Sequence, residues 1–104
     1  MRLWIDDIRT PPVGWDIFHK DVWARTVNSA ISAIVAQENT GNPFTVIDID
    51  HDAGDYAQYG GDYIKLLDWL EETGRNYPIH IHSMNPVGIQ NMRTIIQHNG
   101  WEEV

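Results

Sequence analysis

The chain has 104 residues, a hydrophobic content of 42% and a formal net charge of −8, values expected of one globular domain over residues 1–104. This composition excludes an extended basic surface for nucleic acid, a membrane-spanning segment, and any disulfide or thiolate metal site, because the chain has no cysteine. We therefore expect a soluble cytoplasmic protein whose metal ligands would be oxygen and imidazole nitrogen.

The apolar patterning predicts five strands, three helices and one loop between the first two strands. The strands are expected over 1–7, 22–27, 44–49, 77–83 and, as an edge strand, 101–104. The loop is expected over 8–15, and the helices over 28–37, 62–73 and 86–99. Asn28 or Ser29 is expected to cap the first helix, and Asn85, followed by Pro86, the third. Strands that alternate with helices predict an open α/β fold with a mostly parallel five-stranded sheet, covered on both faces to give three layers.

Polar side chains follow three of these strands at the point where each strand ends. They are Asp6 and Asp7 after the first strand, Asp50, His51 and Asp52 after the third, and His82 and Ser83 after the fourth. The carboxyl ends of parallel strands meet at one edge of the sheet, where ligands bind. The sequence therefore places these side chains together.

Carboxylates crowded at one point are tolerated when a cation neutralises them, and oxygen ligands suit magnesium, manganese or calcium. We expect a divalent ion, magnesium or manganese, with candidate ligands Asp6, Asp7, Asp50 and Asp52. The alternative for each aspartate is a turn former whose side chain bonds nearby backbone amides.

The candidate catalytic residues are Asp50, His51, His82 and Ser83. His51 and His82 are candidates for proton exchange, because imidazole titrates near neutral pH. His80 shares a strand face with His82, and we expect it to be a buried histidine satisfied by one hydrogen bond.

Candidate phosphate ligands are Arg9, Ser83, Asn85 and Gly88. The segment from Asn85 to Gly88 begins a helix, where free backbone amides and the helix dipole attract anions. Arg9 follows the acidic pair and can bind phosphate through two nitrogens. The alternatives are that Asn85 only caps the helix, that Gly88 only permits close packing, and that Arg9 only neutralises the acidic pair.

Three motifs carry a resemblance to a known family: LWIDDIR at residues 3–9, DIDHDAG at 48–54 and HSMNPVG at 82–88. They are similar to motifs of the cyclic-phosphate-processing receiver-like domains, a divergent branch of the response-regulator receiver superfamily, which has a flavodoxin-like fold. The resemblance implies that Asp6, Asp7 and Asp50 bind metal or handle phosphate. The positions that distinguish the branch are Arg9, His51, Asp52, His82, Ser83 and Asn85.

Two features depart from the receiver pattern. Receiver domains have a lysine at the end of the fifth strand, whereas the last segment here, GWEEV, has none. This disfavours signalling through an aspartyl phosphate. The first receiver helix is expected to be reduced to the loop TPPVGW, which would leave one face of the sheet open to a protein partner or a second copy of the chain.

We expect a metal-dependent phosphoesterase that processes a cyclic phosphate or a nucleotide phosphate, on a small phosphorylated ligand or an RNA end. The alternative is a non-catalytic receiver-like module that binds a phosphorylated ligand or a protein partner. Both functions place the ligand at the carboxyl edge of the sheet.

Overall fold

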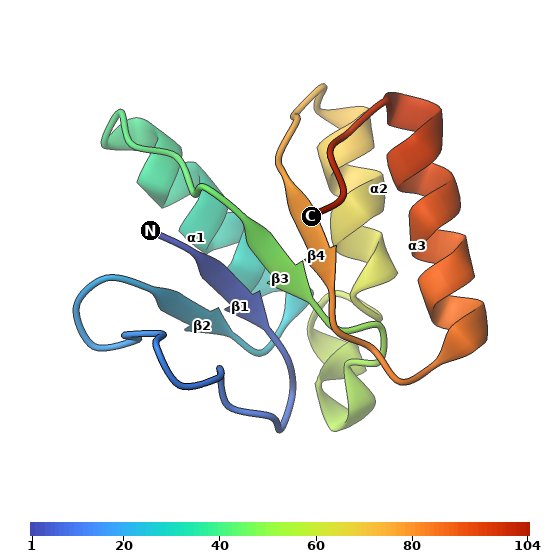
Figure 1. Ribbon diagram of the computed structural model, residues 1–104, viewed down its shortest axis with the longest axis horizontal. Helices are drawn as coiled ribbons and strands as arrows, with labels where there is room; N and C mark the ends of the chain where they lie inside the picture. The colour runs from blue at the N-terminus through green and yellow to red at the C-terminus, as the bar shows by residue number, and fades with distance from the viewer.

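The computed structural model describes residues 1–104 and has an α/β fold built on one parallel sheet (Figure 1). The sheet has four strands of three residues each: β1 (Leu3–Ile5), β2 (Val22–Ala24), β3 (Ile47–Ile49) and β4 (Ile79–Ile81). Their spatial order is β2-β1-β3-β4, and every neighbouring pair is parallel. This confirms the predicted α/β class and the parallel sheet.

Three α-helices connect or follow the strands: α1 (Val27–Asn39), α2 (Ile64–Glu72) and α3 (Pro86–Asn99). Asn85 caps α3 through a bond from the Gly88 amide, and Pro86 takes the first helical position, as predicted. The predicted cap of α1 was wrong. Thr26 caps it, because its Oγ1 accepts from the backbone amide of Ser29. The backbone amide of Thr26 in turn donates to Oγ of Ser29, which completes a capping box.

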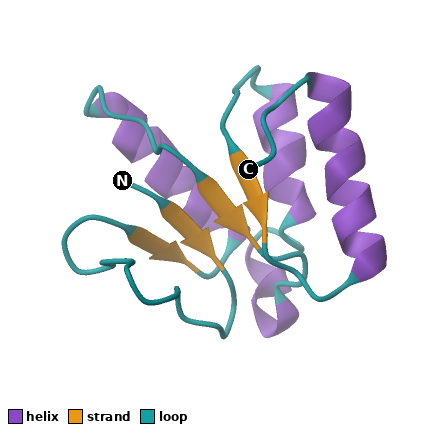
Figure 2. Cartoon of the chain, viewed as in Figure 1, coloured by secondary structure: helices purple, strands orange, loops and turns teal.

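The core lies between the sheet and the three helices. The register aligns Leu3 with Ile47 and Ile47 with Ile79, so one face of the sheet is a continuous apolar surface. This face shares a single buried cluster with side chains of the helices, among them Leu67 and Met92. The helices therefore pack on the same side of the sheet (Figure 2).

The opposite face of the sheet carries aromatic and polar residues, and no helix covers it. The register aligns Trp4 with both Trp23 and Asp48, and Asp48 with His80. The structure thus has two layers, whereas the sequence predicted three. The physical reason is that this face is too polar to bury under an apolar helix: Asp48 and His80 would lose their solvation or their partners.

The segment between β1 and β2 contains turns and no helix. Arg2 anchors it: its guanidinium pairs with Asp21 at 2.9 Å, donates to the Gly14 carbonyl, and stacks over the ring of Trp15. Trp15 in turn meets the ring of Trp4 edge-on, with centroids 5.4 Å apart. The loop therefore shields Trp4, which is buried.

The C-terminal segment lies beside β4 but pairs with it at one point only. Ile79 and Glu103 form an isolated parallel bridge, where the sequence predicted an edge strand over 101–104. None of the helices is long and apolar enough to cross a membrane.

Candidate functional site

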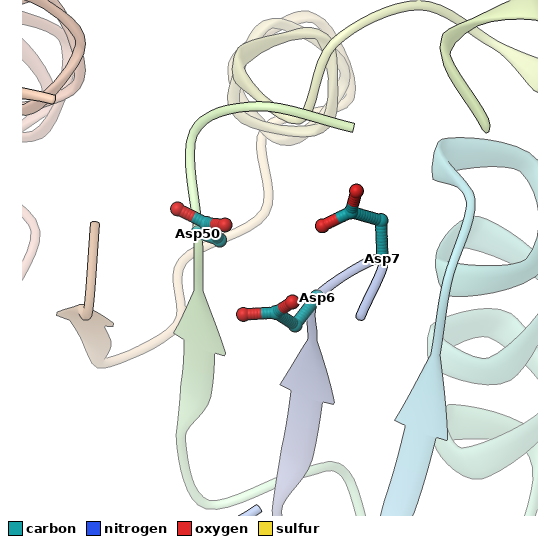
Figure 3. A group of neighbouring side chains, drawn as sticks. All are labelled: Asp6, Asp7 and Asp50. Atoms are coloured by element: carbon teal, nitrogen blue, oxygen red, sulfur yellow. The ribbon is translucent and has the colours of Figure 1, made fainter. Parts of the chain in front are cut away.

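Three carboxylates meet at the carboxyl edge of the sheet. Asp6 and Asp7 follow β1, Asp50 follows β3, and the two strands are direct neighbours. One oxygen from each of the three side chains lies within 4.8 Å of the others, and the three groups face a common space (Figure 3). The predicted convergence of these aspartates therefore occurs, and they could hold a metal ion. Asp52 lies outside this group.

Asp6 is buried and held on both oxygens. Its Oδ1 accepts hydrogen bonds from the backbone amides of Ile8 at 2.9 Å and Arg9 at 2.7 Å, and its Oδ2 lies 2.9 Å from Nε2 of His82. Burial alone would raise the pKa of Asp6, but these hydrogen bonds and the nearby His82 outweigh it, so the pKa is lowered. Asp6 therefore stays ionised in the fold.

Asp7 has the opposite electrostatic setting. Burial raises its pKa first of all, and the negative charges of Asp6 and Asp50 raise it further. A cation among the three carboxylates would relieve this repulsion. Gly54 approaches Asp7 so closely that a Cβ at position 54 would lie 2.5 Å from Oδ2, and its φ of +56° is one that glycine favours.

Beside the carboxylates lies a cavity of about 260 Å³, lined by Arg9, Asp50, Asp52, Ser83, Met84 and Asn85. The Arg9 guanidinium forms no ion pair with any carboxylate, so it is available to an anion. The Ser83 hydroxyl accepts a hydrogen bond from the backbone N–H of Asn85 at 3.1 Å and still has its own proton to donate. The structure thus brings Arg9, Ser83 and Asn85 next to the acidic group. Gly88, the fourth predicted phosphate ligand, does not line the cavity, and its amide donates to Oδ1 of Asn85.

The two candidate histidines bind different carboxylates. His51 Nδ1 lies 2.8 Å from Asp52 Oδ1, and its ring packs on the backbone of Gly88. His82 lies between Asp48 and Asp6, with Nδ1 2.6 Å from Asp48 Oδ1 and Nε2 on Asp6. Neither ring lines the cavity.

The structure corrects the expectation for His80. It is exposed rather than buried, although it makes the expected single hydrogen bond, from Nδ1 to Asp48 at 2.9 Å. It is exposed because the face that it shares with Asp48 has no helix over it.

Sequence reasoning missed Asp48 and Trp4 as parts of this site. Asp48 contacts His80 and His82 on the neighbouring strand, and the Trp4 ring stacks on His82 with centroids 3.9 Å apart and planes 2° from parallel. The sequence did contain an indication of this role for Asp48: it is a charged residue inside the apolar run VIDID, and the next strand carries histidines at the alternate positions 80 and 82.

The strand order, the aspartates after β1 and β3 and the serine after β4 define a receiver-like α/β domain with its site at the carboxyl edge of the sheet. The family model of the cyclic-phosphate processing receiver domain matches residues 1–98, and the chain belongs to this family, as its motifs predicted. No protein of curated function matches the chain, and no solved structure does.

Proposed function

We propose that this protein is a metal-dependent phosphoesterase that opens a cyclic phosphate at the carboxyl edge of its sheet. One observation carries the proposal: the three-aspartate group of Asp6, Asp7 and Asp50 directly adjoins a cavity that holds an unpaired arginine. A cation site next to an anion site suits metal-assisted phosphate chemistry.

The donor set fits magnesium or manganese, because all three ligands are carboxylates. Asp50 uses Oδ1 to accept from the His51 amide, and its Oδ2 accepts no hydrogen bond. Oδ2 of Asp6 accepts one bond, which leaves it a lone pair. A divalent ion bound there would polarise a phosphate oxygen and lower the pKa of water.

The side chains around the cavity would bind and orient the phosphate. Arg9 pairs with its oxygens, and Ser83 and Asn85 donate hydrogen bonds to them. In the reaction, water adds to phosphorus, one ester P–O bond of the ring breaks, and the water proton ends on the released alkoxide. The product is an open phosphate monoester.

His51 is the residue that we assign to proton transfer. Asp52, which lines the cavity, holds its Nδ1, and Nε2 makes no hydrogen bond within the chain, so that nitrogen is free to carry a proton. Asp52 thereby orients the ring in this proposal. His82 has both ring nitrogens occupied by carboxylates, and we assign it the positioning of Asp6.

Calorimetric titration with magnesium and manganese tests the metal site. We expect saturable binding to the native protein that Asp50→Asn abolishes. The matched control is Glu72→Gln, which removes an exposed carboxylate at the end of α2 and should leave binding unchanged. Equal binding by all three proteins would contradict the site.

Phosphorus NMR of adenosine 2′,3′-cyclic phosphate with the metal-loaded protein tests the chemistry. We expect conversion to the open monoester, and we expect Asp50→Asn to stop it. Saturable binding without product would instead assign the protein to non-catalytic capture of a phosphorylated ligand.

A further inference from the structure

A second cavity, of about 540 Å³, shares no lining residue with the acidic group or the phosphate cavity. It separates the short 3-10 helix η1 (Gly54–Tyr59) from the start of α1 and is lined by Thr26, Asn28, Ser29, Ser32, Tyr56 and Tyr59. The two tyrosine rings have centroids 6.4 Å apart and planes tilted by 47°. Tyr59 is 51% exposed, so an aromatic face is open to a ligand.

The cavity also offers hydrogen-bonding groups that the chain itself does not use. The Asn28 amide, the Ser32 hydroxyl and the Tyr59 hydroxyl form no hydrogen bond with another residue. Tyr56 has only a long contact of 3.5 Å with Arg25 Nη1. Aromatic faces with a few free donors and acceptors suit a flat heterocycle such as a nucleobase.

The segment η1 joins this cavity to the acidic group. Its first residue, Gly54, lies against Asp7, and a Cβ on Gly60, directly after η1, would lie 2.7 Å from Oδ1 of Asn28. Six residues of 3-10 helix span about 12 Å. In Figure 1 this segment lies at the end of the sheet to which the strand arrows point. The acidic group and the tyrosine cavity therefore lie at opposite ends of one short segment.

Cations flank both sites although the chain is strongly acidic. Arg9 and Arg25 are two of the three cationic side chains that form no ion pair, the third being Lys20. Arg9 lines the phosphate cavity, and Arg25 lies at the edge of the tyrosine cavity. The net charge of −8 disfavours a long nucleic acid, which leaves a single nucleotide or a terminal one.

We propose that the tyrosine cavity is a nucleobase subsite, and that the ligand of the site is a nucleoside cyclic phosphate. The base stacks on Tyr59 beside Tyr56, and Asn28 and Ser32 bond to its edge. This inference rests on the proposed function for the phosphate end of the ligand. The assignment of the base subsite depends on the tyrosine cavity alone, so it can be tested separately from the phosphate site.

The first experiment uses adenosine, which has a base and no phosphate, on the full chain without added metal. We expect amide NMR shifts at residues 26–32 and 54–60, and the same shifts in Asp50→Asn. Tyr59→Leu should abolish them, whereas Tyr59→Phe should retain them because it keeps the ring. Phe18→Leu, which removes an exposed ring from the loop after β1, is the control that should bind as the native protein does.

The second experiment compares adenosine 2′,3′-cyclic phosphate with the cyclic phosphate of methyl riboside, which lacks the base, both with manganese. We expect the adenosine compound to bind about tenfold more tightly, a typical effect of one stacked base. Tyr59→Leu should remove this difference and leave the base-free compound unaffected. A trinucleotide with the same cyclic end shows the source of the ligand: tighter binding assigns RNA ends, and equal binding assigns free nucleotides.

Equal affinity for the two cyclic phosphates, or adenosine shifts that survive Tyr59→Leu, would overturn the nucleobase subsite. The adenosine result is independent of the metal site, because that experiment uses neither a phosphate nor a metal. Failure of the proposed function alone would leave adenosine binding intact while metal binding and turnover were absent.

Discussion

The first turn of α3 leaves no room for a side chain at position 88. A Cβ built on Gly88 would lie 2.6 Å from Cδ2 and 2.8 Å from Nδ1 of His51, well inside the contact distance of about 3.5–4.0 Å. Asp52 holds the same ring through Nδ1, and the Gly88 amide is tied to the Asn85 cap. Gly88→Ala must therefore displace the His51 ring or pull the helix off its cap.

Two opposing terms set the size of the effect. Alanine gains up to about 1 kcal/mol over glycine from helix propensity. Overpacking against a held ring costs roughly 1–3 kcal/mol. We expect the steric term to win, so Gly88→Ala should lower the free energy of unfolding by about 1–2 kcal/mol.

The sign should reverse when the ring is absent. In a His51→Ala background the clash is gone, and Gly88→Ala should then raise the free energy of unfolding by up to about 1 kcal/mol. The coupling between the two positions is the difference, about 2 kcal/mol. Gln90→Ala, at an exposed position of α3, is the control and should change stability little.

Urea unfolding followed by tryptophan fluorescence measures all of these proteins. Gly88→Ala with no loss of stability in the native background would refute the contact with His51. So would an effect that is equal in the two backgrounds, because the loss would then come from the backbone of α3.

Three further predictions concern buried polar groups. Although burial opposes the ionisation of Asp21, hydrogen bonds from Arg2 and the Asp16 amide lower its pKa to about 2, from 3.8 when unfolded. The ionised group therefore stabilises the fold above pH 3.8, and its contribution of about 2 kcal/mol is lost as pH falls through 2. The stability gap between the native protein and Asp21→Asn should shrink over that window in urea titrations; a constant gap would contradict the shift. His82→Phe keeps the stacking on Trp4 but removes one hydrogen bond from each of two buried carboxylates, and should cost about 3 kcal/mol in the same assay. Asp48 keeps its bond to His80, and Asp6 keeps its two backbone amides. A cost below about 1 kcal/mol would mean that water replaces the ring nitrogens. Tyr63→Phe removes the hydrogen bond that the buried hydroxyl donates to the Arg25 carbonyl at 2.7 Å, and should cost about 1 kcal/mol in the same assay. An unchanged stability would mean that the Arg25 carbonyl finds another donor.

The convergence of Asp6, Asp7 and Asp50 could be predicted from the sequence. Each aspartate directly follows an apolar run, and parallel strands must bring such positions to one edge whatever the details of packing. The cap of α3 was equally local, because Asn85 and Pro86 act within one helical turn. The prediction of the cap of α1 failed, because Thr26, Asn28 and Ser29 are neighbouring polar residues that can each take the position. Only the backbone geometry selects Thr26.

The number of layers was decided by the tertiary structure. Strand alternation shows that Trp4 and Asp48 point away from Ile47, but it does not show what covers them. A loop held by Arg2 and Trp15 covers Trp4, and these contacts join residues far apart in the chain. The expectation of a third layer came from the general rule that parallel sheets are covered by helices on both faces.

The composition and local patterns of this chain determined its α/β class, its family motifs and the acidic end of its sheet. Only the tertiary structure decided which carboxylates His82 binds. His82 bonds to Asp48 because β4 lies next to β3 in this register, and it reaches Asp6 because β1 is the next strand across. Side-chain partners across a sheet depend on strand order, and strand order is a property of the whole packed chain.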